Sequence, residues 1–235
     1  MLAMNRTAFE HGLYGRLKQE AGHHWQAYIH HDFVRQLAAG TLPDGAFRRY
    51  LVQDYLFLIH FARAYALLAY KLRTLPEIRA AVVSLEAIVK ELPMHVAYCA
   101  QWGLREEEMA KEPEASETLT YTRYVLDIGQ SGDVLDLLVA LIPCVAGYAE
   151  IGQRLRDDPA TVLAGNPYAE WIQNYSDGDY LSGARAAIDQ LERVGLARGA
   201  EQRFDALSAI FTTATRLESA FWQMGLTPHP TVIAV

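Results

Sequence analysis

The 235-residue sequence has only two cysteines, Cys99 and Cys144, and neither belongs to a CxxC motif or a Cys/His pairing. Such isolated cysteines indicate neither a disulfide nor a structural zinc site. Proline (9 residues) and glycine (16 residues) are also few. Most stand singly, which favours one compact domain without a flexible linker. We place that domain at residues 1–225 and a C-terminal tail at 226–235.

Positive charge is scarce as well. Lys and Arg total 21 against 28 Asp and Glu, a formal net charge of −7. Binding to nucleic acid or to an anionic membrane needs clustered basic residues, whereas here they alternate with acidic ones. The composition therefore argues against both partners.

A signal peptide and a transmembrane segment are not indicated either. Residues 1–10 lack a basic region followed by an apolar core. The apolar stretch at 50–70 carries Asp54, His60 and Arg63, and such charges make a bilayer-spanning helix costly. We expect a cytoplasmic protein with this stretch as a buried helix.

Apolar residues recur every three or four positions almost throughout, and no segment alternates as a half-buried strand does. No repeat of fixed period is present, so the expected fold is all-α, an irregular multi-helix bundle. The predicted helices cover residues 8–20, 22–39, 44–73, 76–102, 116–130, 133–157, 167–175, 178–196 and 201–224.

Several helix boundaries carry specific signals. Gly40 suits a left-handed C-cap, Pro76 suits a first helical turn, and Gly132-Asp133 ends one helix and N-caps the next. Pro93 would kink or split its helix. The acidic run at 105–114 is expected to be an exposed connection.

Cys144 is the first candidate for chemistry. It follows Pro143, which should kink the helix beside the thiol. Tyr148 shares its helix face, and Gly147 leaves room for a flat molecule to approach. The alternative is a small buried hydrophobe, the commoner fate of a lone cysteine and the one expected for Cys99.

Two carboxylates lie on aromatic helix faces. Asp54 aligns with Phe57 and Phe61, and Glu218 precedes Phe221 and Trp222 by three and four residues. An unpaired buried carboxylate costs several kcal/mol, so each should be paired or functional. The alternatives are an ion pair between Asp54 and Arg63, and an exposed Glu218 over the edge of an aromatic core. Further aromatic faces with hydroxyl groups come from Tyr121, Tyr124 and Tyr175, although most tyrosines in helical proteins simply pack.

A metal site is a third possibility. Glu91 and His95 lie about one turn apart if their helix continues through Pro93, with Glu86 near as a third ligand. A di-metal helical oxidase would need a second carboxylate-histidine pair at such spacing, and none is evident. We therefore expect no metal.

Taken together, four segments resemble the TenA (thiaminase II) family. They are YLVQDYLFL at 50–58, FARAYA at 61–66, LIPCVAGYAEIG at 141–152 and ESAFW at 218–222. The Pro-Cys-x3-Tyr-x-Glu-x-Gly element is the most specific of them. The resemblance covers nearly the whole chain in the expected order.

The resemblance implies a haem-oxygenase-like bundle, usually a homotetramer, that uses no haem, metal or other cofactor. It implies cysteine-dependent hydrolysis of aminopyrimidines in thiamin salvage, of thiamin itself, or of both. By similarity, Cys144 is the nucleophile, Glu218 the acid/base group and Asp54 the carboxylate that holds the ring amine. The matching aromatic pocket residues are Phe57, Tyr121, Tyr148, Tyr175 and Phe221. Phe57 stands where some members have tyrosine, which puts the preferred substrate in doubt.

Two other classes of function stay open at this point. One is a non-catalytic pyrimidine-binding or regulatory protein on the same fold, and the other is a di-metal oxidase. The combination of Cys144, Glu218 and Asp54 argues against the first.

Overall fold

A computed structural model describes residues 9–227, and every regular element within that range is a helix. The helices are α1 (Gly12–Ala21), α2 (His23–Ile29), α3 (Asp32–Ala39), α4 (Asp44–Lys71), α5 (Leu75–Ala100), α6 (Glu106–Met109), α7 (Ser116–Ser131), α8 (Val134–Asp157), α9 (Ala169–Ser176), α10 (Gly178–Ala197), the 3-10 helix η3 (Ala200–Arg203) and α11 (Phe204–Leu226). The all-α prediction is confirmed.

The helix predicted over residues 22–39 is wrong as a single element, because α2 ends at Ile29 and α3 begins at Asp32. His31 is the N-cap of α3, and its Nδ1 accepts a 3.2 Å hydrogen bond from the backbone N–H of Phe33. Both helices bury aromatic residues against the same core, so the apolar period runs on across the break. Periodicity alone therefore could not show it.

The acidic run at 105–114 is also more ordered than predicted, because it contains α6. Its first turn is closed by Glu108, which accepts a 2.8 Å hydrogen bond from the backbone N–H of Arg105. Met109 is fully buried, and the Tyr55 hydroxyl donates to Glu106 at 3.1 Å. A second hydrogen bond runs from Gln53 Nε2 to the backbone oxygen of Pro113 at 3.0 Å, so an apolar anchor and hydrogen bonds at both ends attach this polar segment to α4.

The other boundary signals act largely as predicted. Gly40 has φ +69° at the C-cap of α3, and Pro76 lies in the first turn of α5. Asp133 caps α8 by accepting from the N–H groups of Leu135 (2.8 Å) and Asp136 (3.2 Å). Pro93 does not split its helix, since α5 runs from Leu75 to Ala100.

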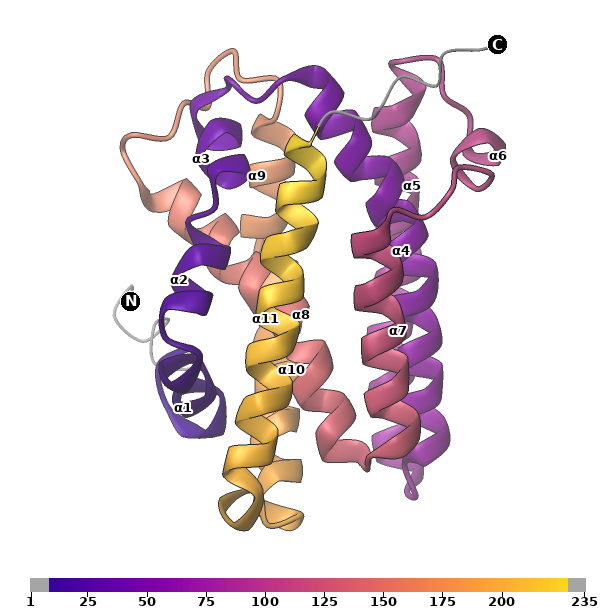
Figure 1. The fold of residues 1–235 in the computed structure, drawn as a ribbon, viewed down its shortest axis with the longest axis vertical. Coiled ribbons are helices and arrows are strands. Elements are labelled where there is room, and N and C mark those ends of the chain that lie inside the picture. Colours follow the sequence, from indigo (N-terminus) through magenta and orange to yellow (C-terminus); the bar gives the residue numbers. More distant parts are fainter. Residues whose placement is uncertain (1–8, 228–235) are drawn as a thin grey trace.

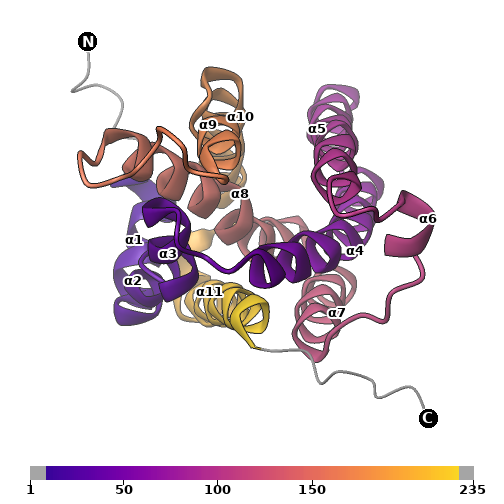
Figure 2. The ribbon, with the colours of Figure 1, turned by 90° about the horizontal axis from the view of Figure 1, so that it is seen from above.

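Helix α8 is the central element of the bundle. It contacts α4 and α7 on one side and α9, α10 and α11 on the others, an arrangement visible from above in Figure 2. Helices α4, α5 and α7 run side by side, while α1 to α3 lie along α11 (Figure 1). Side chains that α4, α8 and α11 direct inward therefore meet in one place.

By length and composition α8 could cross a membrane, since its most apolar window has a mean hydropathy of 1.9. However, 83% of that window is buried inside the bundle, which is the situation of a core helix. The predicted buried helix at 50–70 falls within α4, most of whose residues from Tyr50 to Phe61 are buried.

Two glycines of α8 allow other elements to approach closely. A Cβ on Gly152 would lie 2.4 Å from the backbone oxygen of Tyr175 in α9. A Cβ on Gly147 would lie 2.3 Å from the ring of Tyr28 in α2. Both positions therefore require glycine, and the first brings Tyr175 close to the middle of the bundle. Helix α11 runs to Leu226, and the predicted tail beyond residue 227 lies outside the described residues.

Candidate active site

Cys144 lies midway along α8, beside Pro143, and is partly exposed although Pro143, Gly147 and Tyr148 are buried. Although the residue is partly exposed, the packed protein around the sulfur removes it from water; this desolvation, followed by the negative charges of Glu218, Asp54 and Glu91, raises the pKa of the thiol well above its usual value. Cys144 is therefore protonated at neutral pH. Cys99 is a buried core residue, as predicted.

Glu218 faces the thiol from α11. It is 2% exposed, so the alternative of an exposed glutamate over the edge of an aromatic core is wrong. The Tyr121 hydroxyl on α7 donates a 2.7 Å hydrogen bond to its Oε1. Burial is the main cause that raises the pKa of Glu218 and Asp54 raises it further, whereas the nearby Tyr121 hydroxyl and Cys144 thiol lower it, and the balance of these effects is a pKa of about 8. At neutral pH this carboxyl is mostly protonated and can act as an acid.

Asp54 is buried within α4 and is held by two donors on the same oxygen. His95 Nε2 lies 2.7 Å from its Oδ2, and the Tyr50 hydroxyl donates to that oxygen at 3.1 Å. The ion pair suggested with Arg63 does not form, because Arg63 is exposed and its guanidinium lies 3.5 Å from His60 Nδ1. The partner comes instead from α5.

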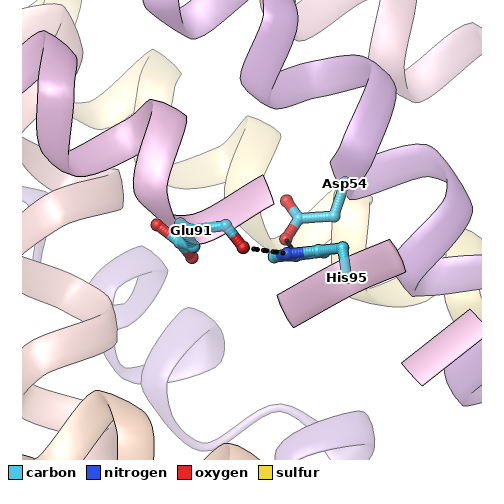
Figure 3. Close-up of side chains that lie close together, drawn as sticks. All are labelled: Asp54, Glu91 and His95. Atoms are coloured by element: carbon cyan, nitrogen blue, oxygen red, sulfur yellow. Dashed lines mark hydrogen bonds and ion pairs between the residues drawn. The ribbon is translucent and has the colours of Figure 1, made fainter. Parts of the chain in front are cut away.

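Glu91 joins this group one turn before His95, and the ligand atoms of Asp54, Glu91 and His95 lie within 4.8 Å of one another (Figure 3). The Tyr175 hydroxyl donates to Glu91 Oε1. Burial raises the pKa of Glu91, whereas the nearby His95 lowers it. Glu86, the third ligand suggested by the sequence, is exposed and lies outside the cluster. The third residue of the cluster is Asp54 instead of Glu86.

Aromatic rings pack around Glu218 and Glu91, which accept hydrogen bonds from Tyr121 and Tyr175 respectively. The ring of Phe57 lies 4.9 Å from that of Tyr121 and 5.6 Å from that of Phe221. On the other side, the ring of Tyr148 lies 4.9 Å from that of Tyr175. Flat, apolar faces therefore flank polar groups that point inward, which suits a small heteroaromatic molecule.

The structure brings together all eight residues predicted for the site. Burial, followed by Tyr50, Asp54 and Glu218, raises the pKa of the Tyr148 hydroxyl. The sequence did not assign Tyr50 or Trp171 to the site. Tyr50 precedes Asp54 by four residues on an apolar helix, a spacing that could have indicated it.

The arrangement of helices is that of the haem-oxygenase-like fold. A domain from Shewanella denitrificans with this fold aligns with a TM-score of 0.70 at 15% identity, covering 90% of each chain. A family model matches residues 18–227 and is described as the TENA/THI-4/PQQC family. The chain belongs to this family, which confirms the resemblance found in the sequence.

Individual relatives extend over most of the chain. An aminopyrimidine aminohydrolase from Halalkalibacterium halodurans is 36% identical over 203 residues, covering 85% of this chain and 89% of that protein. The crystal structure of a TenA family transcription regulator from Silicibacter sp. TM1040 is 45% identical. It aligns with a TM-score of 0.84 and covers 92% of this chain and 97% of that one.

Proposed function

We propose that this protein is an aminopyrimidine aminohydrolase of the thiaminase II type. In this reaction 4-amino-5-aminomethyl-2-methylpyrimidine and water give the 5-hydroxymethyl product and ammonia. The observation that carries the proposal is the buried Glu218 carboxyl beside the Cys144 thiol, where each group shifts the pKa of the other, in an aromatic site that also holds the buried carboxylate of Asp54. The name of the Halalkalibacterium halodurans relative supports the same reaction.

Cys144 and Glu218 together can start the reaction although both are protonated. The Glu218 carboxyl gives its proton to a ring nitrogen while the Cys144 sulfur adds to the adjacent ring carbon, and the Glu218 carboxylate then takes the thiol proton. The net effect is transfer of the thiol proton to the ring. Relay through Glu218 avoids forming a free thiolate beside three carboxyl groups, which the raised pKa of Cys144 shows to be unfavourable.

Addition of sulfur breaks the aromaticity of the ring, so ammonia can leave from the methylene on C5 and an exocyclic alkene forms. Water adds to this alkene, and the Cys144 thiol is expelled with its proton restored through Glu218. Two lower barriers thus replace one high barrier. With thiamin as substrate, the thiazole would leave in place of ammonia.

Asp54 is proposed to hold the exocyclic amine of the pyrimidine, with the rings of Phe57, Phe221 and Tyr148 against its faces. Asp54→Asn should therefore weaken pyrimidine binding as well as turnover. An Asp54→Asn variant with unchanged KM and kcat would contradict this role.

The deciding experiment measures release of ammonia and hydroxymethylpyrimidine from the 5-aminomethyl pyrimidine in metal-free buffer. Wild type should turn over, whereas Cys144→Ser should bind the product pyrimidine with little turnover, because a hydroxyl is a far weaker nucleophile. Cys99→Ser is the matched control for loss of a cysteine and should stay active. If wild type only binds the pyrimidine, the protein is a binding or regulatory protein instead.

The remaining proposals concern the setting of this activity. A small-molecule aminopyrimidine or thiamin is the partner, in thiamin salvage in the cytoplasm, with neither nucleic acid nor membrane involved. Assembly as a homotetramer follows from the family resemblance, and sedimentation of the purified protein would test it.

A further inference from the structure

His95 is fully buried, and both of its ring nitrogens face hydrogen-bond acceptors. Nε2 lies 2.7 Å from Oδ2 of Asp54, and Nδ1 lies 3.3 Å from the backbone oxygen of Glu91, one turn earlier in α5. A carbonyl oxygen and a carboxylate oxygen both need a donor. When Asp54 Oδ2 and the Glu91 carbonyl oxygen both act as acceptors, the two contacts are satisfied together only when both ring nitrogens carry hydrogen, that is, by an imidazolium.

Asp54 is held asymmetrically. Oδ2 also receives the Tyr50 hydroxyl at 3.1 Å, and the Trp171 indole donates in turn to the oxygen of Tyr50 at 3.3 Å. Three helices, α4, α5 and α9, thus support one carboxylate oxygen. Among residues 9–227, none hydrogen-bonds to Oδ1. The second oxygen is therefore available to a ligand.

We infer that His95 is a positioning residue, which fixes the Asp54 carboxylate so that Oδ1 can accept a hydrogen bond from the exocyclic amine of the substrate. This rests on the proposed function. An imidazolium suits this role because it is the one basic side chain among three acidic ones, Asp54, Glu91 and Glu218. Without it, Asp54 would be a buried carboxylate without a counter-charge.

Stability alone does not explain the pair. Replacing a buried ion pair by apolar side chains of similar size is often neutral or stabilising, because both charges must be removed from water. A purely structural role therefore predicts that the variants change unfolding and leave ligand affinity unchanged. The positioning role predicts that the variants weaken ligand affinity, whatever their effect on unfolding.

The experiment compares His95→Leu, which removes the donor, with His95→Gln, which keeps an N–H group of similar reach. Affinity for hydroxymethylpyrimidine is measured by calorimetry, and KM and kcat for the 5-aminomethyl pyrimidine by ammonia release. His95→Leu should weaken pyrimidine affinity and raise KM roughly tenfold to hundredfold, the range for loss of a hydrogen bond to a charged group, with a smaller effect on kcat. His95→Gln should recover much of that loss, and the exposed control His23→Leu should match wild type.

A double-mutant cycle with Asp54→Ala tests whether His95 affects ligand binding through Asp54. Because His95 acts through Asp54, adding His95→Leu to Asp54→Ala should weaken binding little further. Additive losses, or unchanged affinity in His95→Leu, would overturn the inference. Nitrogen NMR of labelled histidine gives a readout without substrate, in which both ring nitrogens of His95 should be protonated in wild type and one should lose its proton in Asp54→Ala. A neutral His95 in wild type would also overturn it.

The binding and turnover measurements test the proposed reaction and the role of His95 separately. Wild type that binds the pyrimidine without hydrolysing it would remove the proposed reaction, and the binding cycle would still decide the role of His95. Should His95→Leu fail to fold, His95→Gln and the NMR measurement still give the result.

Discussion

The Tyr121 hydroxyl on α7 donates a 2.7 Å hydrogen bond to Oε1 of Glu218 on α11. This bond stabilises the ionised carboxylate and so lowers the pKa of Glu218, whereas burial raises it, and the balance is a pKa of about 8. Tyr121→Phe removes the donor and should move the pKa of Glu218 upward. The limb of the pH profile of kcat/KM that reports Glu218 should then shift to higher pH.

Tyr124→Phe is the matched control for that shift, because the Tyr124 hydroxyl contacts the backbone oxygen of Ile210 and does not contact Glu218. Its profile should follow wild type. A Tyr121→Phe limb that stays in place or moves to lower pH would show that Tyr121 does not tune Glu218.

The raised pKa of Glu218 also links stability to pH. The folded protein keeps the Glu218 proton to about pH 8, whereas the unfolded chain loses it near the ordinary glutamate pKa of 4.5, so folding becomes less favourable as pH rises between these values. A shift of this size corresponds to a penalty on the order of 5 kcal/mol above pH 8. The glutamine of Glu218→Gln does not ionise, so this variant lacks that pH-dependent penalty.

The free energy of unfolding of wild type, minus that of Glu218→Gln, should therefore fall by several kcal/mol between pH 5 and pH 9. Urea denaturation at both pH values measures it, and other titrating groups cancel in the difference. A difference independent of pH would mean that Glu218 ionises normally in the folded protein.

Packing of α8 against α9 depends on Gly152. A Cβ there would lie 2.4 Å from the backbone oxygen of Tyr175, and backbone cannot turn aside as a side chain can. Gly152→Ala should destabilise the fold by about 1–3 kcal/mol, the usual cost of overpacking. Displacement of Tyr175 should also lower turnover.

Gly183 supplies the control for this substitution, because it is exposed within α10 and nothing lies within 4 Å of an added Cβ. Gly183→Ala should stabilise the protein by about 0.5–1 kcal/mol through lower entropy of the unfolded chain. Thermal unfolding of both variants compares them. Equal effects would mean that the α8–α9 contact adjusts freely.

Removal of metal should leave the reaction intact. Asp54, Glu91 and His95 have the composition of a metal site, but the proposed mechanism passes through Cys144 and Glu218 and uses His95 as a donor to Asp54. Turnover after treatment with EDTA should equal that of untreated protein, and metal analysis should find no stoichiometric ion. Loss of activity that is restored by one metal would favour the metal-dependent alternative.

Much of the helical framework could be predicted from the sequence, because apolar spacing and capping residues act locally. The faces carrying Asp54, Cys144 and Glu218 follow from the same spacing, since residues three or four apart share a side of a helix. The break before Asp32 could not be predicted this way, because α2 and α3 bury their apolar residues against one core.

The sequence by itself determined most of the helices, the three polar residues on their aromatic faces and the family resemblance. Only the tertiary structure decided the partners. Asp54 pairs with His95, 41 residues away, and Glu218 with Tyr121, 97 residues away. Such pairings depend on how whole helices pack. The spacing of residues along one helix does not predict which distant side chain will contact a buried carboxyl group.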